Sequence, residues 1–298
     1  MTVIDAHHHV WDLAVRDQPW LAGDERAAIR RTFTADDLRP AAAAAGVTAT
    51  VLVQTVTEAA ETPEMLALAA ADPLIEAVVG WTDLTAPGVA DELARLAAGP
   101  GGGRLAGIRH QVQGEPDPDW LRRPDVIRGL RAVADAGLAY DLIVQPHQLA
   151  AAAYAAQSVP QLTFVLDHGG NPPAAAGELE PWARAVRALA RCPNAVCKLS
   201  GLATEAEPGT APGAGPGAAP PAALRTVADV ILSAFGAGRV MFGSDWPVCL
   251  LASDYPAVMG LARALTAGLS PAERAAVFAG TAARVYRIRD RPEGAQWP

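Results

Sequence analysis

The sequence predicts a single-domain (β/α)8 TIM barrel over residues 1–298. Short runs of apolar and β-branched residues alternate with longer alanine- and leucine-rich segments, and eight such pairs follow one another along the chain. Near-continuous apolar strands separated by helices are typical of a parallel sheet covered on both faces. If the barrel is correct, the reactive side chains lie at the C-terminal ends of its strands.

Each element of this barrel is expected from a local pattern. Four helical runs are preceded by residues suited to an N-cap, namely Thr34, Thr62, Asp125 and Ser253. The strands are expected at residues 3–7, 47–54, 75–81, 105–110, 138–144, 162–168, 195–201 and 239–245. The helices are expected near residues 34–45, 61–72, 87–98, 122–136, 147–157, 179–191, 222–236 and 253–267.

Two features qualify this arrangement. A doubly wound open sheet is the alternative fold, but it would place a glycine-rich phosphate loop after the first strand, where His-His-His-Val-Trp stands. Residues 204–221 are so rich in Gly, Pro and Ala that they predict a flexible loop between the seventh strand and its helix. Both a tolerated insertion and a mobile lid agree with this composition.

Composition excludes several classes of function. The 298 residues are 51% hydrophobic and 19% charged, and the net charge of -8 argues against nucleic-acid binding. The sequence contains neither an apolar run long enough to span a membrane nor the pattern of a signal peptide.

The three cysteines form no Cys-x-x-Cys spacing and are expected to be reduced, which favours a cytoplasmic protein. A homo-oligomer is compatible with the sequence, which does not determine the oligomeric state.

All six histidines follow or end an expected strand. Strand alternation places His7 and His9 on one side of the first strand and His8 on the other. Two imidazoles at this spacing can bind one metal ion, although His-x-His alone is weak evidence. The other three are His110, His147 and His168.

Charged residues in apolar strands complete the candidate site. Asp245 ends the eighth strand, which closes against the first, so its carboxylate is expected beside His7 and His9. Lys198, the only lysine, and Arg109 lie inside apolar strands, where a cation needs a partner or a polar cavity. Both could stabilise an oxygen that gains negative charge. Buried ion pairs with barrel carboxylates such as Asp5 or Asp141 are the alternative.

The chain resembles the amidohydrolase superfamily, and within it the branch of sugar lactonases that includes L-fuconolactonases and L-rhamnonolactonases. The resemblance covers nearly the whole length in the correct order. The matching stretches are IDAHHHVWD at 4–12, PWL at 19–21, VLVQ at 51–54, GWTDL at 80–84, GIRHQVQGEPDPDWLRRPDV at 107–126, DLIVQPHQL at 141–149, VLDHGGNPP at 165–173, KLSGLATEA at 198–206 and FGSDWPV at 242–248.

This resemblance implies a hydrolase that opens the ester ring of a small lactone. His7, His9, His168 and Asp245 would be catalytic and would hold one divalent metal, expected to be zinc, with Asp245 deprotonating water and then protonating the departing ring alkoxide. Members with two metals carry a carboxylated lysine on strand four, where this chain has Arg109, so one metal is expected. A metal-free mechanism stays open, because a lactone carbonyl is electrophilic enough for histidine and cationic donors to polarise it.

The substrate is expected to be a small-molecule lactone of undetermined identity. Arg109 and Lys198 are expected to bind it, and further contacts are expected from His147, Trp11, Trp81 and Trp246, which follow strand ends. The loop at 204–221 and Gln145 depart from the pattern of relatives, so they leave the particular lactone open. A decarboxylase of the same superfamily and a catalytically inactive binding barrel are the alternative functions.

Overall fold

The eight expected strands form one parallel sheet. The computed structural model describes residues 2–175, 178–205 and 220–288, and its strands follow one another in chain order. The register is regular from β4 to β8 and shifts by a residue at several points between β1 and β4. The strands are β1 (Val3–His8), β2 (Val47–Val53), β3 (Ile75–Gly80), β4 (Leu105–His110), β5 (Ala139–Leu142), β6 (Phe164–Leu166), β7 (Ala195–Leu199) and β8 (Val240–Phe242).

The segment after β8 closes the sheet against β1. The amide of Asp245 donates a hydrogen bond to the carbonyl of His7 at 2.8 Å, and the amide of His9 donates to the carbonyl of Trp246 at 2.7 Å. A glycine is required at this seam, because a Cβ on Gly243 would lie 2.7 Å from the Cβ of His7. Sequential strand order and this contact give a nearly closed barrel, and the open doubly wound alternative is wrong.

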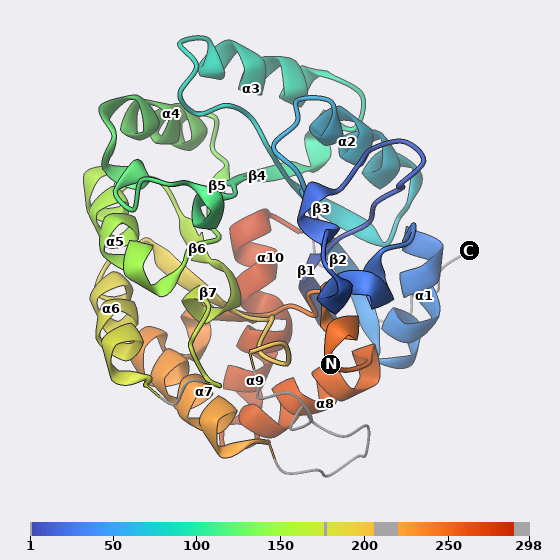
Figure 1. Cartoon of the computed structure of the whole chain (residues 1–298), viewed down its shortest axis with the longest axis vertical. Coiled ribbons are helices and arrows are strands. Elements are labelled where there is room, and N and C mark those ends of the chain that lie inside the picture. Colours follow the sequence, from blue (N-terminus) through green and yellow to red (C-terminus); the bar gives the residue numbers. More distant parts are fainter. Residues whose placement is uncertain (1, 176–177, 206–219, 289–298) are drawn as a thin grey trace.

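Eight helices surround the strands, as predicted (Figure 1). Apolar residues on the outer face of the strands pack against the inner faces of these helices and form the larger hydrophobic core. The helices are α1 (Ala35–Ala44), α2 (Glu61–Ala71), α3 (Val89–Ala98), α4 (Pro124–Asp135), α5 (Leu149–Ser158), α6 (Glu180–Ala190), α7 (Ala222–Phe235) and α8 (Tyr255–Leu265).

One of the four expected N-caps is correct. Thr34 caps α1 in a capping box with Asp37. Thr62 instead lies inside α2, where its hydroxyl accepts a hydrogen bond from the amide of Trp81, 2.7 Å away, and donates one to the Trp81 carbonyl. Asp125 is the second residue of α4, and α8 is capped by Asp254 rather than by Ser253. The N-terminal residues before α2 and α4, Ala60 and Arg123, make no side-chain capping hydrogen bond.

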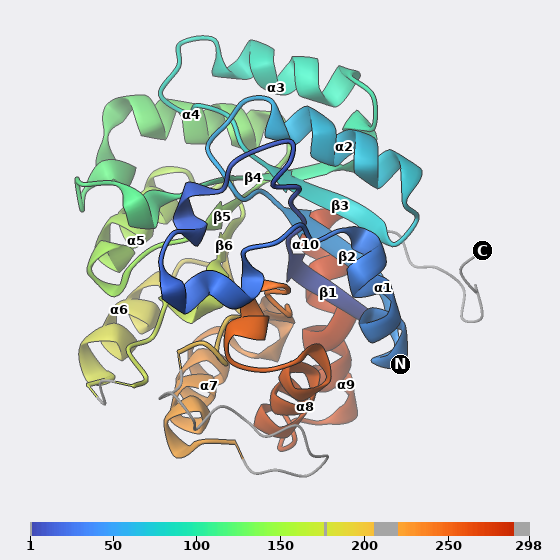
Figure 2. The same ribbon diagram turned by 45° about the vertical axis from the view of Figure 1, so that its right-hand side comes forward.

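A C-terminal helical segment closes the bottom of the barrel and was not predicted. It consists of α9 (Pro271–Ala275), one π-helical turn η10 (Ala276–Gly280) and α10 (Thr281–Tyr286). In Figures 1 and 2, α10 lies at the centre of the ring of strands. Ala282, Tyr286 and Ile288 pack against inward-facing strand residues to form a second core. The Ser270–Glu273 capping box was the available signal for this segment.

The loops at the opposite end cover the barrel mouth. The segment after β1 carries two short 3-10 turns, η1 (Pro19–Leu21) and η2 (Asp24–Ile29), and crosses in front of the strands in Figure 2. The predicted flexible loop at 204–221 falls mostly on residues 206–219, which lie outside the described part of the chain. None of the described helices combines the length and the apolar character that crossing a membrane requires.

Candidate active site

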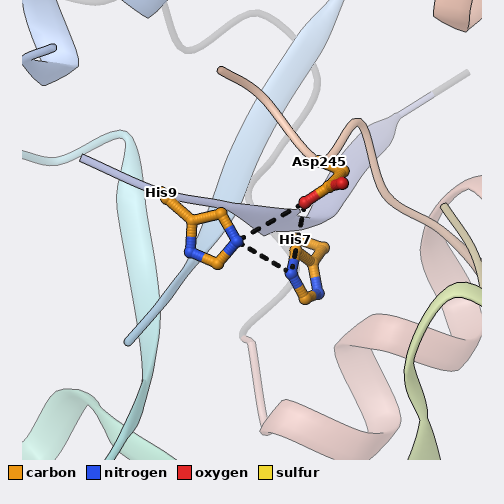
Figure 3. Close-up of side chains that lie close together, drawn as sticks. All are labelled: His7, His9 and Asp245. Carbon is orange, nitrogen blue, oxygen red and sulfur yellow. Dashed lines mark hydrogen bonds and ion pairs between the residues drawn. The ribbon is translucent and has the colours of Figure 1, made fainter. Parts of the chain in front are cut away.

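His7 in β1, His9 directly after this strand and the carboxylate of Asp245 point toward one another (Figure 3). The Nε2 atoms of His7 and His9 are 3.1 Å apart, and Oδ1 of Asp245 lies 3.6 Å from the first and 3.4 Å from the second. His8, between them in sequence, points away and places its Nε2 2.9 Å from Oγ1 of Thr50. The structure therefore brings together the histidine pair and the acid that the sequence singled out.

His168 joins this group from the other side of the barrel. Its Nε2 lies 3.9 Å from Oδ1 of Asp245, and its Nδ1 lies 2.9 Å from Oγ of Ser200. Both His168 (φ 52°) and Asp245 (φ 56°) have left-handed backbone conformations, which are uncommon for residues other than glycine. Their strands therefore end earlier than predicted, at Leu166 and Phe242, and the chain turns so that both side chains face the same point.

Burial favours the neutral form of all three imidazoles. It lowers the pKa of His9 to about 3, with a further contribution from the charge of Arg109, and lowers the pKa values of His7 and His168. The carbonyl of Val53 lies 2.7 Å from Nδ1 of His9, so this nitrogen carries the proton and the Nε2 lone pair faces Asp245. Neutral imidazoles whose Nε2 atoms converge on Asp245 are suited to a metal ion or to orienting a water molecule.

Burial also raises the pKa of the Asp245 carboxyl above its usual value, although the charges of His168 and Arg109 offset part of this effect. A raised pKa makes the carboxylate a stronger base. Asp245 is therefore both close enough to the imidazoles to share a ligand with them and basic enough to accept a proton.

A buried network of ion pairs lies beneath the histidines. Nζ of Lys198 is 2.5 Å from Oδ2 of Asp141, 3.0 Å from Oδ1 of Asp167 and 3.1 Å from Nδ1 of His7. The hydroxyl of Tyr286 donates a hydrogen bond to Asp141 from the bottom of the barrel. Lys198 is fully buried and does not line the cavity, so its observed contacts are the ion pairs given above as the alternative to substrate binding.

Asp167 links this network to the site and was missed in the sequence. Burial alone would raise its pKa, but the charges of Lys198, His7 and Arg109 outweigh burial and hold the pKa well below the usual value. Asp167 is therefore a permanent anion 3.4 Å from Nδ1 of His7. Its position, directly before His168 at the end of an apolar strand, was the available signal.

Arg109 faces the site with its donors already used. Its Nε and Nη2 donate to the side chain and carbonyl oxygens of Gln54, and Nη1 donates to Asp167 at 2.9 Å. The remaining direction of Nη1 points to Nε2 of His7 at 3.4 Å. Arg109 thus supplies a firmly oriented positive charge at the site rather than a free hydrogen-bond donor.

A polar cavity of about 390 Å³ opens above these residues, within the size range of small-molecule sites. Arg109, His9, His168 and Asp245 lie on its wall. The uncharged polar side chains on the wall were not predicted as site residues, although several directly follow strand ends. They are Thr55, Gln111, Gln113, Gln145, Asn171 and Thr204.

Besides Lys198, four predicted substrate contacts lie outside the lining of this cavity. The ring of Trp11 packs against those of Trp20 and Phe33, and the ring of Trp246 packs against Phe33. The indole of Trp81 donates a hydrogen bond to His110, and His147 is exposed on the short turn η6 (Pro146–Gln148). The aromatic side chain that does line the cavity is Trp20, which was quoted only as part of the PWL stretch.

The donor set fits one divalent metal ion. Bonds of 2.0–2.2 Å to a tetrahedral zinc ion set the donor atoms about 3.3–3.6 Å apart, close to the 3.1, 3.4 and 3.6 Å separations among His7, His9 and Asp245. His168 is the more distant donor, with its Nε2 3.9 Å from Oδ1 of Asp245. The second group that could hold a metal ion, His7 with Asp167 and His168, is less suitable because Lys198 and Arg109 already neutralise Asp167. The nearby guanidinium also opposes a second cation.

Fold and site together define the class of this protein. A family model described as amidohydrolase matches residues 4–288, and the chain belongs to this family. The L-fucono-1,5-lactonase of Burkholderia ambifaria is 39% identical over 297 residues, 98% of either chain. The L-fucono-1,5-lactonase of Burkholderia multivorans is 38% identical over 292 residues, 96% of either chain.

A solved structure agrees with this assignment. The crystal structure of an amidohydrolase from Burkholderia multivorans with bound zinc superimposes with a TM-score of 0.87. The two chains are 36% identical, and the match covers 97% of this chain and 100% of the other. The predicted superfamily is therefore confirmed.

Proposed function

We propose that this protein is a lactonase that hydrolyses the ester ring of a sugar aldonolactone, with L-fucono-1,5-lactone or a close stereoisomer as substrate. The observation that carries the proposal is the convergence of the Asp245 carboxylate with three neutral imidazoles at a polar cavity, whose wall includes Asp245, His9 and His168 while His7 lies buried behind it. The two L-fucono-1,5-lactonases supply the substrate class. No feature of the described site favours decarboxylation, and all four residues that an inactive barrel would be expected to lose are assembled.

The cavity wall suits a polyhydroxylated ring. Amide side chains both donate and accept hydrogen bonds, so Gln111, Gln113, Gln145 and Asn171 can pair with several hydroxyl groups. The half-buried ring of Trp20 offers an apolar surface on which the carbon face of a sugar can rest. These groups would position the lactone carbonyl over Asp245.

Different residues then have different roles in the first chemical step, the attack of water on the lactone carbonyl. Asp245 removes a proton from water, and the water oxygen attacks the carbonyl carbon. The carbonyl oxygen gains negative charge, which the fixed positive charge of Arg109 stabilises without reorganisation. Lys198 and Asp167 hold His7 in place from below, and the carbonyl of Val53 holds His9, so that both imidazoles keep their Nε2 atoms at the reacting centre.

We further propose that the site holds one zinc ion through His7, His9, His168 and Asp245. A zinc ion held by these residues would supply Lewis-acid chemistry: it would lower the pKa of a water molecule and polarise the lactone carbonyl. The charge balance agrees with this role, because among the described residues no Lys or Arg lies within 4.0 Å of the Asp245 carboxylate.

The test is to offer the protein a panel of aldonolactones and to measure hydrolysis through the proton that ring opening releases. Asp245→Asn should lower kcat by about 10²–10⁴-fold, the usual contribution of a general base. Asp229→Asn, on an exposed face of α7, changes the same functional group away from the cavity and should behave as wild type. Unchanged activity in Asp245→Asn, or no lactone opened by the wild-type protein, would refute the proposal.

A further inference from the structure

A second carboxyl group, that of Glu205, lies on the wall of the same cavity. After β7 the chain turns sharply at Gly201, whose φ of 67° favours glycine. The amide and hydroxyl of Thr204 donate hydrogen bonds to the carbonyl of Gly201, and the amide of Glu205 donates to the carbonyl of Leu202. This turn carries Glu205 over the mouth, where it lines the cavity with His168 and Asp245.

The carboxyl of Glu205 has no ion-pair or hydrogen-bond partner among the described residues, whereas other buried acids of the barrel do. Asp141 and Asp167 pair with Lys198, and Glu61 accepts hydrogen bonds from the hydroxyl and amide of Thr55. Glu205 is half-buried, so the absence of a partner is not explained by full solvation. Among the described residues, the partner of this carboxyl is therefore left to a ligand in the cavity, to solvent or to a proton.

The surroundings of Glu205 favour the protonated form of its carboxyl group. Burial, and then the negative charge of Asp245, raise the pKa of Glu205 to about 7. The cationic side chains of the cavity do not neutralise it, because Arg26 pairs with Glu25 and Arg109 pairs with Asp167. The charged and titratable groups that share the cavity with Glu205 are His9, Arg26, Arg109, His168 and Asp245.

We propose that Glu205 is the acid that protonates the ring oxygen as the lactone opens; this inference rests on the proposed lactonase activity. Water adds its oxygen to the carbonyl carbon and gives one proton to Asp245. The bond between the carbonyl carbon and the ring oxygen then breaks, and the ring oxygen takes the proton of Glu205 to become a hydroxyl. Solvent returns a proton to Glu205 and removes the one on Asp245, so the net reaction is lactone plus water to hydroxy acid.

This division of labour replaces the expectation that Asp245 also protonates the leaving oxygen. Oδ1 of Asp245 lies within 3.9 Å of three imidazole nitrogens, in the position of a ligand or a base. Among the described residues, no imidazole or cation pairs with the carboxyl of Glu205, which lines the same cavity. Two carboxyl groups whose environments differ in this way commonly divide into base and acid.

The decisive experiment is the pH profile of kcat/KM on an aldonolactone, corrected for uncatalysed opening. The acid must be protonated, so wild-type activity should fall as the pH rises through about 7. Glu205→Gln should lower kcat by about 10²-fold and remove this alkaline limb. Glu178→Gln, an exposed glutamate outside the cavity, should keep the wild-type profile. An alkaline limb unchanged in Glu205→Gln would overturn the proposal.

The leaving group gives a second readout, which loss of fold would not produce. A phenolic ring oxygen has a conjugate acid with a pKa of about 10 and departs without a proton, whereas an aliphatic alkoxide needs one. Glu205→Gln should therefore affect an aliphatic lactone far more than a phenolic one, and equal loss on both would contradict the inference. If the wild-type protein opens neither, the proposed lactonase activity itself is wrong.

Discussion

The contact between Gly201 and the ring of His168 offers a sharp test of the site geometry. A Cβ at residue 201 would lie 2.7 Å from Nδ1 and 2.8 Å from Cγ of His168. Carbon atoms in contact prefer separations of 3.5–4.0 Å, so in Gly201→Ala the imidazole must retreat by about 0.7 Å or more. That movement displaces Nε2 from Asp245 and disturbs the contact between Nδ1 and Ser200.

The expected effect on turnover is large. A displacement near 1 Å at a reacting centre can cost about 10²-fold in rate, so kcat/KM of Gly201→Ala should fall by roughly that factor. The variant should also lose about 1–2 kcal/mol of stability, because alanine at a positive φ is strained. Steady-state kinetics on an aldonolactone and thermal unfolding measure the two effects separately.

Gly46→Ala is the matched control. Gly46 has a φ of 78°, but a Cβ there would meet no atom within 4 Å. It should therefore lose a similar amount of stability while keeping wild-type kcat/KM. If Gly201→Ala loses no more activity than Gly46→Ala, the position of His168 does not matter to the reaction and its assigned role is refuted.

Two further predictions concern the charges of the site. Lys198→Met should lower the free energy of unfolding by about 3–5 kcal/mol, because Asp141 and Asp167 would each lose their contact with a fully buried cation. Denaturant unfolding measures this change, and a curve that matches wild type would show that the ion-pair network contributes little to stability. Dialysis against a chelator should abolish turnover and lower the unfolding midpoint, and zinc should restore both, because a ligand at 100 times its Kd stabilises the folded state by about 2.7 kcal/mol. Full activity in protein shown by elemental analysis to contain no metal would favour the metal-free mechanism.

Local patterns in the sequence were sufficient to predict the outline of the fold. They also singled out the four side chains that the structure brings together, namely His7, His9, His168 and Asp245. Alternation along a strand places His7 and His9 on one face whatever surrounds them, and the succession of strands and helices leaves few arrangements other than a barrel. The C-terminal helices escaped prediction because the barrel pattern was already complete before residue 271. The capping signal at Ser270 is local, but the role of Tyr286 under Asp141 depends on where the barrel bottom lies.

Only the tertiary structure decided which charges meet. Lys198 lies 57 residues from Asp141, and whether it faces substrate or a carboxylate depends on how the strands bring β5, β6 and β7 together. Trp11 and Trp246, which follow strand ends, pack against Phe33 instead of lining the cavity, and this neighbour is brought to them only by the tertiary structure. The backbone turns at His168 and Asp245, which aim both side chains at one point, follow from closure of the barrel rather than from any pattern of neighbouring residues. Strand periodicity specifies a side of the sheet, whereas a catalytic geometry is a set of distances between segments far apart in the chain.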